Sequence, residues 1–599
     1  MAAAYIAALI PALAMALTQP VWSRVDEAHH ADFIIQLSHG VYPVANKTLI
    51  DPETIRVMES TGVFRAFYAP GSYPLPDLTA IGTPPAGMSD RANAAWMLRH
   101  LWQLSHESIQ PPVYYLSMVP VWWVANGLGG PFAAIYALRV ISALAIAALA
   151  PIAVAVARIL VPTRPEVALV AAIFAALLPG LDLNGTRISN DAFATAIGGL
   201  VVLLAVRWAA GGWTWRGAVL MGLILGAGML VKITLAGLVP AVILSALWQP
   251  GPARWTVGLG RLVLAGAIAG ACVLPWFALN LHNYGAIMPG PSLRLSDSLA
   301  VPLNAPFIPL NLAVFELTYW TGEPWGALVL AAPFAVLAGL LALMAPVGVV
   351  KLLRDRPPAA GPLAVAIVAA SGMVAVSLVL PVLADFEFVA PGRYAYPALP
   401  AIAALFAIGV CMVLANKVAR RAAVAIYAAM AVLMVTASAA GFPRAPEAGS
   451  GAPPASAAVE VATASSSFGG VAIDVQRVAF DSIGGATWLQ VTVTNSGLNQ
   501  AEWTVPPYIT DGDVSAIGDY LKSTHLPGAL DPGQAVTGWL YIPLDPARLH
   551  AGSLHVRFQD VAVDGYRMVG DINLDVPLTA IRTPWPRQSS GSPSSTTCS

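Results

Sequence analysis

The stretch AIYALRVISALAIAALAPIAVAVARIL, residues 134–160, decides the fold class, because only Arg139 and Arg158 are charged in it. A helix of about 20 mostly apolar residues is long enough to cross a lipid bilayer, so we expect this segment to lie in one. Comparable runs recur up to residue 441, which predicts an α-helical polytopic membrane protein. By this length criterion we place about eleven spans, near residues 2–20, 134–160, 167–183, 192–208, 217–233, 235–250, 262–280, 326–350, 362–384, 394–416 and 422–441.

The composition of the 599 residues agrees with burial in a lipid bilayer, since 57% are hydrophobic and 11% are charged. Soluble proteins carry about 25% charged residues, so most of this surface cannot face water. The formal net charge of −1 excludes nucleic acid as a partner, because phosphate binding needs a basic surface. Residues 1–17 lack a basic start, so we interpret them as a retained first span rather than a cleaved signal peptide.

Basic residues gather in alternate loops between the predicted spans, for example Arg158 with Arg164 and Arg420 with Arg421. The positive-inside rule places such loops in the cytoplasm. The opposite loops, above all the long loop 21–133, then lie outside, as does everything after residue 441. We therefore expect a multi-pass protein of the cytoplasmic (inner) membrane with an extracytoplasmic C-terminal domain.

Residues 112–128 (PPVYYLSMVPVWWVANG) are apolar enough to count as a further span, but a span there would invert every later loop. We instead interpret them as an outer helix that lies in the membrane interface, where aromatic side chains are common. The aromatic residues expected at the headgroup level are Tyr114, Tyr115, Trp122 and Trp123.

The sequence pattern changes after the last predicted span. Residues 442–464 are rich in Pro, Gly, Ala and Ser, which indicates a linker after a transmembrane domain of residues 1–441. Beyond it, segments such as VAIDVQRVAF (471–480) alternate apolar and polar residues, as half-buried strands do. We predict a β-sandwich over 465–585 and a disordered tail over 586–599.

Ionisable residues are scarce in the predicted outer loops, and they occur at the membrane level of one side. Asp26 and His30 would share one face of a helix that begins near Asp26, although an acidic residue at a helix start is also an ordinary cap. Ionisable groups at the membrane are costly unless they serve a site, so their joint placement indicates a candidate site. Its members are Asp26, Glu27, His30, Glu107, Arg139, Asp191, Lys232 and Arg393.

The first outer loop carries the pattern Asp-Glu-x-x-His at 26–30, followed by Leu37, Gly40 and Pro43. With HESIQPPVYYL (106–116) and GRYAYPALPA (392–401), this pattern resembles the GT-C superfamily of membrane glycosyltransferases over residues 1–440. The similarity is greatest to aminoarabinose transferases and protein O-mannosyltransferases. The outer β domain resembles in layout that of actinobacterial arabinofuranosyltransferases.

The resemblance implies an inverting enzyme that moves a sugar from a polyprenyl-phosphate donor to an acceptor hydroxyl in cell-envelope glycan assembly. By position, Asp26 matches the catalytic carboxylate that deprotonates the acceptor, with Glu27 as its neighbouring helper. Cationic side chains would bind the donor phosphate, and carboxylates with a histidine would bind a divalent metal cation of unknown identity. The phosphate-binding candidates are Lys232, Arg393 and Arg139, and the metal-binding candidates are Glu107, Asp191 and His30.

Two other functions remain open at this point. A transporter or flippase of a lipid-linked glycan would place ionisable residues near the bilayer midplane, whereas the predicted spans are almost free of charge. A non-catalytic glycan-binding assembly protein would use exposed aromatic residues of the C-terminal domain, although core packing is their commoner fate. These aromatic candidates are Trp488, Trp503, Tyr508, Trp539 and Tyr541.

The substrates are only partly specified by the sequence. The inner loops contain no P-loop and no G-x-G-x-x-G motif, which favours a lipid-linked donor over a sugar nucleotide. The acceptor stays open among a glycan, a lipid and a protein.

Overall fold

The structure is a computed structural model of the chain. It describes residues 1–22, 26–45, 47–60, 88–89, 91–92, 104–105, 107–248, 254–288, 307–322, 328–355, 360–383, 392–441, 451–503, 507–511, 514–518, 523–524, 526, 529–549 and 552–578. The predicted tail at 586–599 and the first part of the predicted linker lie outside these residues.

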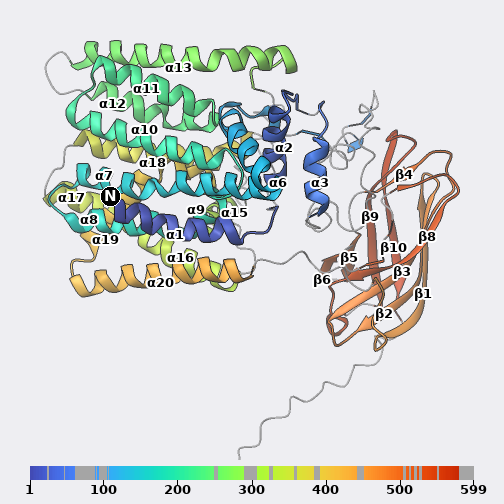
Figure 1. Cartoon of the computed structure of the whole chain (residues 1–599). Helices are drawn as coiled ribbons and strands as arrows, with labels where there is room; N and C mark the ends of the chain where they lie inside the picture. The colour runs from blue at the N-terminus through green and yellow to red at the C-terminus, as the bar shows by residue number, and fades with distance from the viewer. Residues whose placement is uncertain are drawn as a thin grey trace, which may run out of the picture. The chain divides into compact units, whose positions relative to one another are not determined.

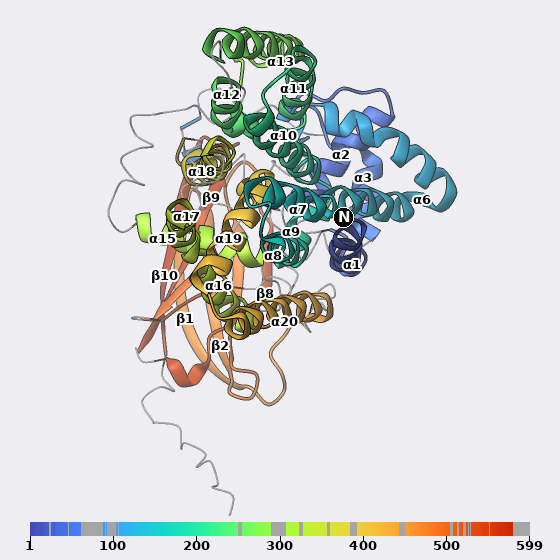
Figure 2. The same ribbon diagram turned by 90° about the vertical axis from the view of Figure 1, so that its left-hand side faces the viewer.

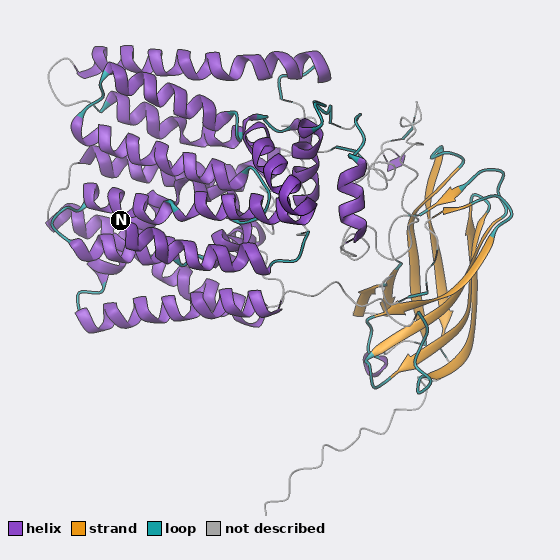
Figure 3. Ribbon diagram, in the orientation of Figure 1, coloured by secondary structure: helices purple, strands orange, loops and turns teal. Residues whose placement is uncertain are grey.

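The chain divides into two compact units, one helical and one built of strands (Figure 3). The first unit comprises Met1–Ser60 and Ser105–Arg444, and the second comprises Thr61–Leu104 and Ala445–Ser599. The later boundary falls within the residues predicted as linker. Part of the predicted first outer loop, however, belongs with the second unit.

Arg91 illustrates how this part of the loop joins the second unit. Its guanidinium Nε donates a hydrogen bond to Asp560 at 2.8 Å, and it also pairs with Asp571. Arg557 pairs with the same Asp571 carboxylate from a neighbouring strand.

The first unit is a bundle of helices that lie side by side, as two perpendicular views show (Figures 1 and 2). Helices α2 and α3 lie at one end of this bundle (Figure 1). The helices are α1 (Ala2–Thr18), α2 (Glu27–Ser38), α3 (Pro52–Ser60), η2 (Glu107–Ile109), α6 (Val113–Ala147), α7 (Leu149–Leu160), α8 (Pro165–Ala176), α9 (Pro179–Gly185), α10 (Asp191–Gly211), α11 (Trp215–Met229), η3 (Ile233–Leu238), α12 (Val239–Leu247), α13 (Arg254–Tyr284), α15 (Phe307–Thr321), α16 (Leu328–Ala342), α17 (Met344–Asp355), α18 (Ala360–Leu383), η4 (Gly392–Ala398), α19 (Leu399–Val413) and α20 (Lys417–Gly441).

Among the described residues, seven helices are long and apolar enough to cross a membrane, or eight if the bent pair of α8 and α9 forms one span. We expected a single span at 167–183, but these two helices meet at an angle of 46°. Pro179 begins α9, and a proline cannot continue the hydrogen bonding of the preceding helix. Three shorter apolar helices cover Ala2–Thr18, Trp215–Met229 and Ile233–Leu247, so about eleven spans stays a prediction.

The helical unit exposes apolar side chains and buries several ionisable ones. Glu27 and Arg139, for example, are both fully buried. In soluble proteins the charged residues are mostly exposed. A surface that contacts lipid tails needs the opposite arrangement, with apolar side chains outside and charged side chains buried. The chain is accordingly a multi-pass membrane protein. Exposed apolar residues include Leu128, Leu169, Val263, Leu274 and Val336.

Helix α6 is broken at Gly130, whose φ of 75° lies in the left-handed region that glycine adopts without strain. The break separates residues 113–129 from the remainder of the helix. It falls close to the boundary that we expected between an interfacial helix and the second span. The interfacial placement itself stays a prediction.

The aromatic residues of this first part of α6 differ from our expectation. We placed four of them at the headgroup level, but Tyr114, Tyr115 and Trp122 are buried, while Trp123 is 57% exposed. The reason is packing against α2, where the ring of Phe33 lies 4.2 Å from that of Tyr115 between centroids. This face of α6 therefore supports the first outer loop.

The second unit contains the two predicted layers of antiparallel strands. One sheet has the order β1-β2-β3-β8, and the other has the order β6-β5-β9-β4-β7, with β10 paired to β9. Strand β1 begins within the residues expected to be linker. The strands are β1 (Ala458–Phe468), β2 (Val471–Asp481), β3 (Ala486–Asn495), β4 (Ala501–Glu502), β5 (Tyr508–Asp511), β6 (Val514–Ile517), β7 (Ala529–Leu530), β8 (Ala535–Ile542), β9 (Ser553–Val563) and β10 (Met568–Pro577).

The two sheets share one apolar core, to which alternate residues of β2, β3, β9 and β10 contribute. Trp488 and Trp503 are only 5% and 4% exposed; the Trp503 ring belongs to the shared core, and the Trp488 ring packs against that of Tyr541. They are therefore not available to stack on a sugar, and the core-packing interpretation holds for both. Tyr508 is 37% exposed.

Candidate active site

Helix α2 begins at Glu27, directly after Asp26, as the sequence predicted. Asp26 occupies the N-cap position, yet its side chain makes no capping hydrogen bond. Its φ of 54° is left-handed, a conformation that Asp and Asn tolerate better than most residues do. Capping, the ordinary explanation for an acidic residue at a helix start, therefore does not account for this carboxylate.

Glu27 points away from solvent and forms a bidentate ion pair with Arg139 of α6. The two nitrogen–oxygen distances are 2.8 and 2.6 Å, and both side chains have no exposed surface. The guanidinium also donates to the carbonyls of Gln19 and Pro20, and the Glu27 carboxylate accepts from the Ile188 amide at 3.0 Å.

These contacts change the roles that we assign to the pair. A fully buried guanidinium cannot reach a lipid-linked phosphate, so we correct Arg139 from phosphate binding to positioning. The Glu27 carboxylate is likewise committed to Arg139, so we correct Glu27 from a catalytic helper to a positioning residue. Together they fix the start of α2, and with it Asp26, to α6.

His30 and Glu107 lie next to each other in the buried part of the cluster. His30 Nδ1 lies 2.7 Å from the Tyr115 hydroxyl and 3.7 Å from Glu107 Oε2. Burial lowers the pKa of His30 to about 3, so its imidazole is uncharged at neutral pH. Burial, and then the negative charge of Asp26, raise the pKa of the Glu107 carboxyl above its usual range.

Lys232, Asp191 and Arg393 form the cationic part of the cluster. Lys232 Nζ pairs with one oxygen of Asp191, and Arg393 Nε lies 3.7 Å from the other. The ring of Tyr394 lies beneath both cations, 4.8 Å from the ammonium and 5.5 Å from the guanidinium carbon. Lys232 and Arg393 thus place two positive charges around the single carboxylate of Asp191.

This arrangement also revises the expected metal ligands. Asp191 already has two cations as partners, so we correct it from a metal ligand to the counter-ion that holds Lys232 and Arg393. Its position at the start of α10 is not explained by side-chain capping, because no capping hydrogen bond is formed at that helix start.

Asn190 joins the two parts of the cluster, although it was not among the predicted site residues. Its side-chain amide donates to the Val231 carbonyl at 3.0 Å and to Gln110 at 3.3 Å. The amide of Val113 in turn donates to the Leu230 carbonyl at 3.1 Å. The segment that carries Glu107 is thereby held beside the segment that carries Lys232.

Asp26 lies in the same cluster as the two cations. His30 and Glu107 each experience the charge of Asp26 as well as the charges of Lys232 and Arg393. The predicted acidic and cationic residues, which come from five separate regions of the chain (26–30, 107, 191, 232 and 393), therefore meet at one place. Tyr115, Asn190 and Gln110 complete it and were not among the predicted members.

The residues present fit a divalent cation beside Asp26. Glu107 Oε2 is buried and has no hydrogen-bond partner among the residues that the structure describes. It lies next to a neutral imidazole and close enough to Asp26 for the two carboxyls to repel. Carboxylate and imidazole groups suit several divalent metals, so Asp26, Glu107 and His30 are the residues that would hold one.

Gly392 sets the position of Arg393 through its contact with α15. Its amide donates to Thr318 at 3.0 Å, and an added Cβ would lie 2.3 Å from the amide nitrogen of Tyr319. Backbone cannot move aside as a side chain can, so Gly392→Ala is expected to destabilise the protein by about 1–3 kcal/mol. Thermal unfolding in detergent micelles measures this change. Gly270→Ala, whose added Cβ meets nothing within 4 Å, is the control and should not lower the midpoint.

A family model described as dolichyl-phosphate-mannose-protein mannosyltransferase matches residues 128–278. No curated protein sequence matches the chain. Among solved structures, it is similar to the Archaeoglobus fulgidus oligosaccharyltransferase tethered with an acceptor peptide, at 13% identity and a TM-score of 0.36, covering 74% of this chain and 55% of that one.

Two further structures from Archaeoglobus fulgidus are similar at the same level. One is the oligosaccharyltransferase in complex with Zn and sulfate, with 15% identity and a TM-score of 0.32, covering 56% of this chain and 44% of that one. The other is the oligosaccharyltransferase AglB with an inhibitory peptide and a dolichol-phosphate, with 16% identity and a TM-score of 0.31, covering 56% and 48%. In each case the likeness covers about half of the other chain. The resemblance of this chain to the GT-C membrane glycosyltransferases is confirmed by the family match over residues 128–278, which include Arg139, Asp191 and Lys232.

Proposed function

We propose that the chain is an inverting glycosyltransferase of the outer face of the cytoplasmic membrane. It would transfer a sugar from a polyprenyl-phosphate donor to an acceptor hydroxyl in the assembly of the cell envelope, with the β-sandwich on the same side. The observation that carries the proposal is a single cluster of residues that could act on both the acceptor and the donor. Asp26 offers a carboxylate that does not cap its helix, and Lys232 with Arg393 places two positive charges in the same cluster.

The charge of the cationic part favours a monophosphate donor. A sugar joined to a lipid through one phosphate is a phosphodiester with one negative charge, which Lys232 and Arg393 would attract. When the bond from phosphate to sugar breaks, the leaving phosphate gains further negative charge. Lys232 and Arg393 are held in place by Asp191 and would stabilise that charge as it develops.

Asp26 would act on the acceptor. In this proposal its carboxylate takes the proton of the acceptor hydroxyl while the hydroxyl oxygen bonds to the anomeric carbon. The bond from that carbon to the donor phosphate oxygen breaks on the opposite face, so the configuration inverts and the lipid phosphate leaves. A divalent cation held by Asp26, Glu107 and His30 would offset the repulsion between the two carboxylates and polarise a phosphate oxygen.

The experiment that tests the function is transfer by the purified full-length protein in proteoliposomes. Labelled polyprenyl-phosphate sugars are offered one at a time with a glycan, a lipid-linked glycan and a peptide as separate acceptors. The proposal expects a covalently labelled product from at least one pair, with the anomeric configuration inverted. Uptake of label into the lumen without a covalent product would contradict it and support transport instead.

Lys232→Met is expected to weaken both donor binding and the chemical step. Loss of a charged hydrogen bond costs about 1.5–3 kcal/mol, which corresponds to a roughly ten- to hundredfold fall in kcat/KM for the donor. Lys232→Arg keeps the positive charge beside Asp191 and should retain most of the activity. The matched control is Lys47→Met, because Lys47 is exposed and its Nζ donates to the Asn283 carbonyl at 3.0 Å. Equal kcat/KM in Lys232→Met and wild type would remove Lys232 from donor binding.

A further inference from the structure

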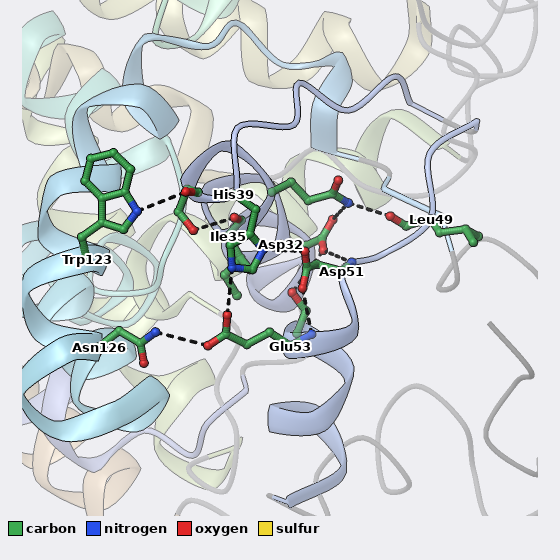
Figure 4. Close-up of polar contacts among 11 residues, drawn as sticks. Asp32, Ile35, His39, Leu49, Asp51, Glu53, Trp123 and Asn126 are labelled. Carbon is green, nitrogen blue, oxygen red and sulfur yellow. Dashed lines mark hydrogen bonds and ion pairs between the residues drawn. The ribbon is translucent and has the colours of Figure 1, made fainter. Parts of the chain in front are cut away.

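A second group of potential metal ligands lies outside the candidate active site, where α2 ends and α3 begins (Figure 4). It consists of His39, Asp51 and Glu53, whose potential ligand atoms all lie within 4.8 Å of one another. His39 Nδ1 is 2.8 Å from Asp51 Oδ2, and His39 Nε2 is 3.3 Å from Glu53 Oε2. None of the three residues takes part in the proposed transfer reaction.

The two carboxylates are oriented by hydrogen bonds that use their other oxygens. Asp51 Oδ1 accepts from the amide of Glu53 at 2.8 Å, and Glu53 Oε1 accepts from the Asn126 side chain at 3.2 Å. Asp51 Oδ2 and Glu53 Oε2 are therefore the oxygens that face the imidazole (Figure 4). Supporting hydrogen bonds of this kind orient the ligands of metal sites.

The backbone beneath the group is fixed by a buried carboxylate. Asp32 has no exposed surface, and its Oδ1 accepts from the amide of Asp51 at 2.7 Å and from the Thr54 hydroxyl at 3.1 Å. Its Oδ2 accepts from Gln36 at 3.1 Å. The start of α3 is thus held against α2 before any ion binds, so the three ligands are arranged in advance.

The side chains of the group favour the binding of a cation. The group brings two carboxylate oxygens to one imidazole, and a set of one nitrogen and two oxygens suits a divalent cation. The carboxylate side chains are 14% and 16% exposed, whereas His39 is 46% exposed. The ion would therefore be reached from solvent on the histidine side and would keep water in its remaining positions.

We propose that His39, Asp51 and Glu53 bind one divalent cation of the Zn²⁺ class. One imidazole nitrogen and two carboxylate oxygens are a ligand set that such ions accept, with ligands about 2.0–2.2 Å from the metal. Ligand atoms at that radius lie about 3–4 Å apart, so the observed group needs only to tighten by side-chain rotation. The ion joins the end of α2 to the start of α3 and thereby stabilises the helix whose other end carries Asp26.

The test uses the full-length protein in detergent micelles after removal of metals with a chelator. Zn²⁺ is titrated against a chromophoric competitor for wild type, His39→Gln, Glu53→Gln and the control His555→Gln. His555 is a fair match, since it is also 46% exposed and pairs with one carboxylate, Asp575, at 2.9 Å. All four proteins are also prepared with Asp26→Asn, which isolates this site from any cation bound in the candidate active site.

We expect one Zn²⁺ site that persists in the Asp26→Asn background and survives His555→Gln. His39→Gln and Glu53→Gln should each weaken it by more than the 10–100-fold that loss of a supporting residue causes. Added Zn²⁺ should raise the unfolding temperature of wild type but not of His39→Gln. The proposal is overturned if Zn²⁺ affinity is the same in wild type and both ligand variants. It is equally overturned if wild type shows no Zn²⁺ site that persists in the Asp26→Asn background.

Discussion

Asp26→Asn is expected to reduce sugar transfer about 10²–10⁴-fold, the range that a general base contributes. The substitution removes the negative charge and the proton-accepting oxygen but leaves the shape of the side chain. Asn also tolerates the left-handed conformation that Asp26 adopts, with its φ of 54°. Since the carboxylate caps no backbone amide, the helix start loses no hydrogen bond. The loss should therefore appear in kcat, with normal insertion and an unchanged unfolding temperature.

The matched control for this prediction is Asp564→Asn in the β-sheet unit. Asp564 has a φ of 53°, so the control makes the same chemical change in the same backbone conformation. It should leave transfer unchanged. If Asp26→Asn retains full activity with a donor that wild type uses, the carboxylate is not the base, and Asp26 would be left with a purely structural place in the cluster.

The helical part of the fold could be predicted from the sequence because a membrane span depends on one local property, the length of an apolar run. Helix α13, for example, contains the predicted span 262–280 within its observed limits. The strands of the second unit were predictable for a similar reason, since alternation of polar and apolar residues is read within a few positions. The break between α8 and α9 was missed, although Pro179 marks it.

The chemistry of the site was harder to predict from the sequence, because it depends on ion pairs between residues that are far apart in the chain. The sequence selected Glu27 and Arg139 as ionisable, but not as partners of each other across 112 positions. Asp191 and Lys232, 41 positions apart, were likewise selected for different roles. Only the folded arrangement shows which charges are already neutralised.

The group of His39, Asp51 and Glu53 was also missed, because it too depends on how the chain folds rather than on a local motif. The metal-binding candidates expected from the sequence were Glu107, Asp191 and His30, of which His30 belongs to the local Asp-Glu-x-x-His pattern. His39, Asp51 and Glu53 instead approach one another because a turn brings α3 back against α2. Asp32 and Thr54 hold this turn by hydrogen bonding. No spacing rule describes such a turn.

Arg139→Met is expected to destabilise the protein by about 3–5 kcal/mol, since it leaves the Glu27 carboxylate buried without its cation. Methionine has a similar volume and suits an apolar surrounding, so the main loss is electrostatic rather than steric. Equilibrium unfolding in mixed micelles with a rising fraction of denaturing detergent measures the change. Because Glu27 holds the residue before it in place, transfer activity should fall as well, even where the protein remains folded.

The double variant Glu27→Leu with Arg139→Met separates the ion pair from general packing. It removes both charges, so it should be more stable than Arg139→Met alone, and the double-mutant cycle should show a coupling of more than about 1 kcal/mol. Arg567→Met is the control, because Arg567 is 79% exposed and lies 3.9 Å from Asp564, and such surface pairs contribute little. Additive effects of Glu27→Leu and Arg139→Met would contradict the positioning role. If the cycle shows coupling, the low activity of Arg139→Met follows from a displaced Asp26 rather than from a lost phosphate contact. In that case the KM of Arg139→Met for the donor should stay near that of wild type while kcat falls.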